Sequence, residues 1–258
     1  MSFRMKLPNA KSFADLINAV SAVVEEGTFR VNESAITLAG MDPAHISLVD
    51  FCFERGGAEV FVCEVPVEIS LSITELLKFL KRARGSEGLE LSFDSERRRL
   101  TISFADPSLS TERTFTVGAL EMAGEKPPSP KLSFDAKARM EIDVFKDAVD
   151  DGMLVSDYVK VTIGPGGVVL AARGELGTSE TKVVKTAERT DTALYDLQAE
   201  AETSAHFSIN YLSKILRAAA AVSKELTVEL SSSKPIRLDF TIPAGHLTYL
   251  IAPRIEST

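Results

Sequence analysis

The chain lacks tryptophan and is poor in the residues that most catalytic and metal sites use. Its 258 residues include no Trp, two Cys and three His. The histidines, His45, His206 and His246, are scattered, and none has a second ligand at zinc-binding spacing. Aromatic residues make up only 7 %, which disfavours base stacking on single-stranded nucleic acid. The sequence therefore predicts no catalytic residue, no metal and no cofactor, although an enzyme whose site escapes motif reading stays open as an alternative.

Long hydrophobic runs are also lacking. No apolar stretch approaches the roughly 18 to 20 residues that cross a bilayer. The first eight residues, MSFRMKLP, have no signal-peptide core. We therefore expect a cytosolic protein with no membrane partner.

The two cysteines flank one turn. Cys52 and Cys63 lie on either side of residues 55–58 (RGGA), so we expect them to face each other across a hairpin. Two reduced, buried thiols are the ordinary interpretation for a cytosolic protein. A cross-strand disulfide stays open for a hyperthermophilic source.

The chain contains one pattern twice. Residues 12–15 (SFAD) match residues 144–147 (VFKD) at an offset of 132 positions. Residues 71–81 match residues 207–217 at an offset of 136, with the apolar positions, a serine and two cationic positions kept. Two matches at nearly one offset predict a tandem pair of one structural unit, each of about 120 residues.

Each half reads as helix, strands, helix, strands, which predicts an α+β fold with many short antiparallel strands. Helices are expected near residues 13–20, 73–80, 144–152 and 209–221. Strands are expected at residues 28–31, 35–39, 46–53, 60–65, 89–93, 100–104, 113–119, 158–163, 168–172, 181–185, 193–198, 226–230, 236–242 and 247–251. The Pro- and Gly-containing residues 120–130 cannot continue a helix and are poor ladder donors. We therefore predict an N-terminal domain at residues 1–119, a connector at 120–130 and a C-terminal domain at 131–258.

Acidic residues exceed basic ones, 37 to 29, for a formal net charge of −8. That balance argues against a protein that simply coats nucleic acid, but it does not exclude a local basic face. Lys78, Lys81 and Arg82 are spaced i, i+3, i+4, opposite the leucines of the second helix, and Arg84 extends this patch. The candidate cations on the other three helices are Lys11, Lys146, Lys214 and Arg217.

These cations allow two interpretations. They either only solvate helix surfaces or contact a phosphate backbone. Repetition of Lys78 and Lys81 as Lys214 and Arg217, in an acidic chain, favours the second interpretation. No helix carries a side-chain cluster that reads base edges, so the expected partner is double-stranded DNA bound without sequence preference. The third helix is an exception, because its aspartates at 143, 147, 150 and 151 make a face that repels phosphate.

Four segments of the chain are distinctive, namely residues 41–49 (MDPAHISLV), 154–159 (LVSDYV), 174–177 (GELG) and 245–256 (GHLTYLIAPRIE). They resemble the proliferating-cell nuclear antigen family, the DNA sliding clamps of archaea and eukaryotes. The resemblance runs nearly end to end. It implies two similar clamp domains, antiparallel sheets outside and two helices per domain inside, in a subunit of a closed trimeric ring. The implied protein is a non-catalytic processivity factor of archaeal type, associated with the nucleoid.

The resemblance also implies surfaces and partners. Clients bearing a short motif would seat in an apolar pocket of Met41, His45, Ile46, Leu48, Leu120, Met122, Pro235, Tyr249, Leu250, Ala252, Pro253 and Ile255. Core packing stays open as the alternative for Met41, Ile46 and Leu48. Edge strands would close the ring through Thr111, Arg113, Thr114, Phe115, Thr181, Lys182 and Val183. Implied partners are a clamp loader, DNA polymerase, ligase and flap nuclease, and two further clamp subunits, either copies of this chain or paralogues. A checkpoint-type clamp subunit is the alternative function.

Overall fold

The computed structural model describes residues 2–121, 127, 132–185 and 192–254. The chain divides into two compact units. The N-terminal unit comprises Met1–Asp42, Val49–Pro127 and Ile242–Leu247. The C-terminal unit comprises Pro43–Leu48, Pro128–Thr241 and Thr248–Thr258. Each unit therefore includes one short segment from the other half of the sequence.

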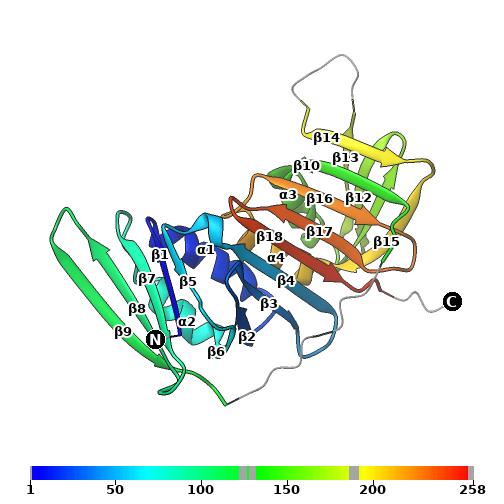
Figure 1. Ribbon diagram of the computed structural model, residues 1–258. Coiled ribbons are helices and arrows are strands. Elements are labelled where there is room, and N and C mark those ends of the chain that lie inside the picture. The colour runs from blue at the N-terminus through cyan, green and yellow to red at the C-terminus, as the bar shows by residue number, and fades with distance from the viewer. Residues whose placement is uncertain (1, 122–126, 128–131, 186–191, 255–258) are drawn as a thin grey trace. The chain divides into compact units, whose positions relative to one another are not determined.

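The N-terminal unit contains two helices and two sets of antiparallel strands (Figure 1). Its helices are α1 (Ala10–Val20) and α2 (Ile73–Leu80). Its strands are β1 (Phe3–Leu7), β2 (Glu26–Val31), β3 (Ala35–Met41), β4 (Ser47–Glu54), β5 (Val60–Val62), β6 (Val67–Ser72), β7 (Gly88–Asp94), β8 (Arg99–Asp106) and β9 (Thr111–Gly118), with the 3₁₀ turn η1 (Arg55–Gly57) between β4 and β5. Five strands form a sheet in the order β5-β1-β7-β8-β9, and β4, β3, β2 and β6 lie side by side in that order.

The C-terminal unit has the same plan. Its helices are α3 (Ile142–Met153) and α4 (Ile209–Ala219). Its strands are β10 (Ala136–Glu141), β11 (Tyr158–Gly164), β12 (Gly167–Gly174), β13 (Gly177–Val184), β14 (Leu194–Ala199), β15 (Thr203–Ser208), β16 (Glu225–Leu230), β17 (Ile236–Thr241) and β18 (Gly245–Ile251). The strand orders are β14-β10-β16-β17-β18 and β13-β12-β11-β15. Each order matches its N-terminal counterpart strand for strand, which confirms the tandem repeat and the α+β fold.

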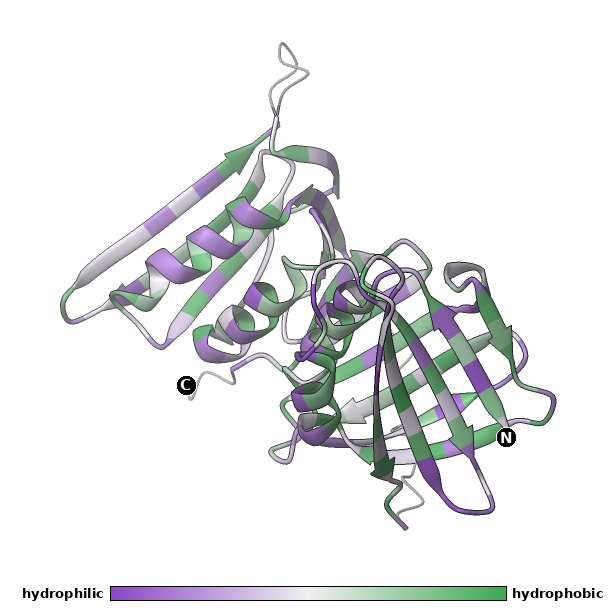
Figure 2. Cartoon of the chain, turned by 90° about the vertical axis from the view of Figure 1, so that its left-hand side faces the viewer, coloured by the Kyte–Doolittle hydropathy of each residue, from purple (hydrophilic) through white to green (hydrophobic). Residues whose placement is uncertain are grey.

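Alternating burial builds one core in each unit. The strand β1 buries Phe3, Met5 and Leu7 and exposes the residues between them to a greater degree. In the N-terminal unit, apolar side chains from both sets of strands and from both helices line one small internal cavity of about 30 Å³. The helices are amphipathic, and each carries hydrophilic and hydrophobic residues on different sides (Figure 2). The unit therefore packs its helices by their apolar stripes and leaves their polar sides accessible.

Most expected elements are present, but four strands were missed: β1, β6, β10 and β15. The second helix is shorter than its cation pattern suggested. It ends at Leu80, with Lys81 as its C-cap and Arg82 in the following turn. The amides of Lys81 and Arg82 still donate to Leu77 O and Phe79 O, both at 2.9 Å. The backbone thus keeps a helical course beyond the last residue of α2.

The expected cysteine hairpin is wrong. Strand β5 pairs with β1, so Cys52 and Cys63 do not oppose each other on paired strands. Both thiols are free, and the Cys63 thiol donates to the Val65 carbonyl at 3.3 Å. Burial raises the pKa of both thiols, which favours the protonated form. Among the described residues, no helix has the length and apolar character that a membrane crossing requires.

Candidate nucleic-acid interface and protein-binding surfaces

In the N-terminal unit the candidate cations gather at the end of α2. Lys78 is exposed but already paired, since its Nζ lies 2.5 Å from Glu75 Oε1 one turn earlier. Lys81, Arg82 and Arg84 follow, all exposed. Within the described residues, none of these three forms an ion pair. Of the candidate cations in this unit, they are therefore the ones most available to an outside phosphate.

On α1 the single candidate cation is neutralised locally. Lys11 Nζ lies 2.7 Å from Asp15 Oδ2, an i,i+4 pair in which the Lys11 side chain is 66 % exposed. The helix begins at Ala10, three residues before the expected range of 13–20, and Asn9 caps it, because Asn9 Oδ1 accepts a hydrogen bond from the Ser12 amide at 3.0 Å. An exposed pair of this kind is worth little to folding and opens easily to a competing anion.

In the C-terminal unit α4 supplies Lys214 and Arg217 on its exposed side. Arg217 Nη2 lies 3.1 Å from Asp150 Oδ1 of the neighbouring helix α3, and the Ser213 hydroxyl donates to the same oxygen at 2.8 Å. Lys214 has no ion pair among the described residues. The α4 face thus presents one unpaired cation and one that is partly neutralised.

The helix α3 is acidic, as its sequence predicts. Asp143, Asp147 and Asp151 are exposed along it. Its one cation, Lys146, lies 2.5 Å from Asp147 Oδ1 and 3.8 Å from Asp143 Oδ1. The hydrogen bond to Asp147 raises the pKa of Lys146 above its usual value. The side chain therefore stays charged, but the neighbouring carboxylates neutralise its charge. Of the four helices, α3 is therefore the least favourable surface for binding phosphate.

The predicted client-pocket residues divide by burial. Leu48 and Tyr249 are buried, 8 % and 0 % exposed, so their side chains pack in the core, which is the alternative left open for Leu48. Tyr249 packs edge-on against Phe240 at 5.8 Å, and burial raises the pKa of its hydroxyl. His45 is exposed, whereas Met41, Ile46, Leu120, Pro235, Leu250, Ala252 and Pro253 are half-buried. Met122 and Ile255 lie outside the described residues.

Within the C-terminal unit the client-pocket segments meet. The Ala252 amide donates to the Ile46 carbonyl at 2.8 Å, which ties residues 43–48 to the chain after β18. His45 has a left-handed backbone, with φ of 57°, at the tip of that segment.

Two strands end their sheets. β9 pairs with β8, and β13 pairs with β12, each as the last strand of its sheet order. Their outer backbone groups are free to continue another sheet. Thr111, Thr114 and Lys182 are exposed, while Phe115 and Thr181 are half-buried and Val183 is buried at 7 % exposure. Phe115 packs against Phe79 at 5.5 Å, so its ring serves its own unit.

Comparison with known proteins decides the family. Residues 2–125 match the sequence profile "Proliferating cell nuclear antigen, N-terminal domain", and residues 129–254 match "Proliferating cell nuclear antigen, C-terminal domain". The chain belongs to the proliferating cell nuclear antigen family.

Curated relatives and a solved structure agree with this membership. The chain is 32 % identical to "DNA polymerase sliding clamp 1" of Pyrobaculum aerophilum over 96 % of each sequence. It is 28 % identical to the "DNA polymerase sliding clamp" of Cenarchaeum symbiosum over the full length of both. A crystal structure of PCNA from Thermococcus kodakaraensis matches 98 % of this chain and 100 % of its own, with a TM-score of 0.89 at 26 % identity. The fold is that of this clamp family.

Two features of this clamp-fold chain were missed by residue patterns. Leu154 and Leu176 are 76 % and 90 % exposed, although both stand in segments that were recognised as family-like. Lys160, Arg173 and Arg254 line one trough together with His206. Cross-strand register brings these cations together, and the register cannot be predicted until the strand pairing is known.

Among the described residues there is no cluster of His, Cys, Asp and Glu that could hold a metal.

Proposed function

We propose that this chain is one subunit of a ring-shaped DNA sliding clamp. It encircles duplex DNA without reading sequence and tethers DNA polymerase, and it has no catalytic role of its own. The observation that carries the proposal is the tandem clamp fold with exposed cations on α2 and α4 of a chain whose net charge is −8. The relatives reported above are named as sliding clamps of DNA polymerase, which favours replication over a checkpoint role. Its DNA association would place it at the nucleoid.

The DNA contacts that we propose are unequal. The strongest contacts to DNA come from the candidate cations that carry no ion pair in the described part of the chain, namely Lys81, Arg82, Arg84 and Lys214. Lys11, Lys78, Lys146 and Arg217 contribute less, since each shares its charge with a carboxylate. Few and weak phosphate contacts suit a ring that must slide, because topology rather than affinity keeps it on the duplex.

The ring would close by strand addition, with β9 of one subunit beside β13 of the next. Three subunits follow from the family, and we propose domain limits at residues 1–119 and 131–258 with a connector at 120–130. Sizing of the purified chain separates the two assemblies. A trimer indicates copies of one chain, whereas a monomer or dimer indicates a ring completed by paralogues.

Clients would bind beside residues 43–48 and the chain after β18. His45, Ile46, Leu250, Ala252 and Pro253 supply an accessible apolar surface there. We propose that polymerase, ligase, flap nuclease and the clamp loader use it in turn. Peptide binding by wild type and by Ile46→Asp tests this surface without requiring DNA.

The decisive experiment is primer extension with a loaded clamp. Lys81→Glu combined with Lys214→Glu should shorten the products of a single binding event several-fold, because reversed charge repels the phosphates that guide the ring. The matched control reverses Arg55 and Arg97, two exposed cations that lie outside α1, α2, α3 and α4. Equal processivity of the two double variants would overturn the assignment of these helices to DNA.

A further inference from the structure

A trough of about 650 Å³ lies on the accessible face of the sheet β13-β12-β11-β15. The opposite face of the same strands is core, since Val159, Val161 and Leu170 are 2 % exposed or less. Side chains that alternate with these residues therefore point away from the core and line the trough. It belongs entirely to the C-terminal unit.

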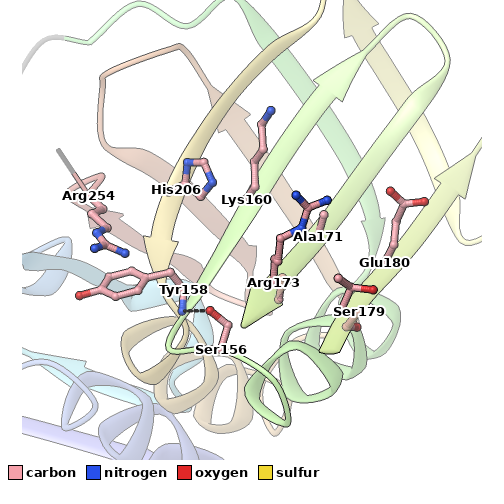
Figure 3. Close-up of a pocket in the computed structure, with 11 residues that line it drawn as sticks. Ser156, Tyr158, Lys160, Ala171, Arg173, Ser179, Glu180, His206 and Arg254 are labelled. Carbon is pink, nitrogen blue, oxygen red and sulfur yellow. Dashed lines mark hydrogen bonds between the residues drawn. The ribbon is translucent and has the colours of Figure 1, made fainter. Parts of the chain in front are cut away.

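Strand register brings its basic side chains together. Lys160 is directly opposite His206 on β15 and opposite Ala171 on β12, and Ala171 is opposite Glu180 on β13. Arg173, two residues beyond Ala171, points to the same side (Figure 3). Directly opposite side chains have Cβ atoms about 5 Å apart. The small Ala171 side chain leaves the space between Lys160 and Glu180 open.

The charge of this basic trough, defined by Lys160, Arg173, His206 and Arg254, is strongly one-sided. Three of these residues are lysine or arginine, and the single carboxylate in the lining is Glu180. Glu180 is already engaged, because Lys182 Nζ lies 2.9 Å from its Oε1. Neither Lys160 nor Arg173 has an ion pair among the described residues. A chain with an excess of acids thus holds unneutralised cations in one concave place.

Arg254 is fixed at the rim. Its guanidinium lies 4.0 Å from the centre of the Tyr158 ring, and its amide donates to the His206 carbonyl at 2.7 Å. The Tyr158 amide in turn donates to Ser156 Oγ at 3.2 Å. A guanidinium stacked by its face keeps its in-plane N–H groups free for a carboxylate. The donor fork is therefore oriented before any ligand arrives.

We propose that the basic trough binds an acidic, extended segment of a partner protein. Alternate side chains of an extended segment share one face, so two carboxylates at i and i+2 can reach Arg254 and Arg173 or Lys160 together. Charge-assisted, bidentate pairing with arginine supplies both strength and orientation. The inference goes beyond the proposed clamp function, because it requires neither DNA nor a closed ring.

Charge around the trough disfavours a nucleic acid as the occupant. Asp157, Glu175 and Glu202 are exposed at the ends of its strands. Duplex DNA presents one charge per about 1.7 Å along its axis, so a helix laid over the trough would meet these carboxylates as well. A short acidic segment ends before it reaches them.

The test is fluorescence anisotropy with the full chain and a labelled five-residue peptide that alternates Glu and Ser, which is shorter than the strands of the sheet. Its matched control peptide has Gln in place of Glu. Wild type should bind the Glu peptide at least tenfold more tightly than the Gln peptide. Arg173→Gln and Lys160→Gln should each weaken the Glu peptide about five- to tenfold, consistent with about 1 to 1.4 kcal/mol per charged contact. Arg97→Gln, which removes an exposed cation elsewhere, should leave affinity unchanged.

Three outcomes would overturn the proposal. The first is equal affinity for the Glu and Gln peptides. The second is a 20-base-pair duplex that displaces the Glu peptide and loses affinity equally in Arg173→Gln, which would make the occupant nucleic acid. The third is a changed oligomeric state of Arg173→Gln in sedimentation, which would make the occupant a neighbouring copy. Thermal melting of each variant verifies the fold, and since both side chains are on the accessible face, the melts should match that of wild type.

Discussion

Arg113 of β9 forms a bidentate ion pair with the buried carboxylate of Glu87. Arg113 Nη2 lies 2.6 Å from Glu87 Oε2, and Nε lies 3.2 Å from Oε1, while the Glu87 side chain is 2 % exposed. The Arg84 amide donates to the same carboxylate at 2.7 Å, and Arg113 Nη2 also donates to Arg82 O at 3.0 Å. Arg113, expected as a subunit contact, therefore holds the cationic segment after α2 against the edge strand of its own unit.

Removing Arg113 should destabilise the N-terminal unit. In Arg113→Met the Glu87 carboxylate keeps its burial but loses its guanidinium, and we expect the free energy of unfolding to fall by about 2 kcal/mol. Urea unfolding measures this change. Arg97→Met is the control, because its side chain is 80 % exposed and 3.9 Å from Asp94, and it should change stability by less than about 0.5 kcal/mol. Equal effects of the two variants would contradict a structural role for the Arg113 pair.

The same pair should make stability depend on acid. Burial alone would raise the pKa of the Glu87 carboxyl, but the Arg84 amide and the Arg113 guanidinium together hold that pKa below its usual value. The ionised Glu87 carboxylate therefore contributes to the free energy of unfolding. This contribution is complete above the pKa of the unfolded state, about 4.3, and is lost as the pH falls through the lower pKa of the folded state. The stability difference between wild type and Arg113→Met should therefore shrink from pH 7 to pH 3. In a Glu87→Gln background, the effect of Arg113→Met should be independent of pH.

Freeing Arg217 should strengthen DNA binding. Asp150→Asn removes the carboxylate that shares the charge of Arg217, while its amide oxygen can still accept from the Ser213 hydroxyl. We expect duplex affinity at low salt to rise about two- to fivefold, in line with the worth of an exposed ion pair. Asp151→Asn changes the net charge equally and is the control. If both variants raise affinity by the same factor in anisotropy titrations, the local pairing of Arg217 with Asp150 is unimportant.

Sequence periodicity predicted the helices and most strands because their apolar residues recur at clean intervals. The missed strands show where that signal fails. β10 buries Ala136, Ala138 and Met140, which alternate with Lys137 and Arg139, and two of its core residues are alanines, which carry little β preference. β10 is a strand because it pairs with β14 on one side and β16 on the other, and this pairing cannot be predicted from the residues of β10 alone.

The candidate sites were predictable only as far as local spacing reaches. Residue type and helical spacing placed Lys81 and Lys214 on exposed sides, where the structure has them. Spacing could not tell that Arg217 is engaged by Asp150 on a different helix, 67 positions earlier. Nor could it tell that Tyr249 points into the core. Each of these depends on contacts between distant segments, which local patterns do not encode.

Exposed leucines at one end of β13 should contribute to subunit contact. Leu176 forms the β12–β13 turn with Glu175, between the paired Gly174 and Gly177. A Cβ at Gly174 would lie 1.8 Å from the Val155 carbonyl oxygen, so this turn lies directly against the segment that contains Leu154. The two leucines, 90 % and 76 % exposed, therefore stand beside the strand edge that we propose to join subunits.

Leu154→Asp combined with Leu176→Asp should raise the dissociation constant of the oligomer at least tenfold, because apolar area that a neighbour would bury becomes charged. Sedimentation equilibrium measures that constant, in the presence of paralogous subunits if the ring is mixed. Val65→Asp, at a residue 67 % exposed on the N-terminal unit, is the matched control. The fold should survive in all variants, since none of these side chains is buried and thermal melting should stay within a few degrees of wild type. A dissociation constant that moves equally in the control, or not at all in the double variant, would remove this end of β13 from the subunit contact.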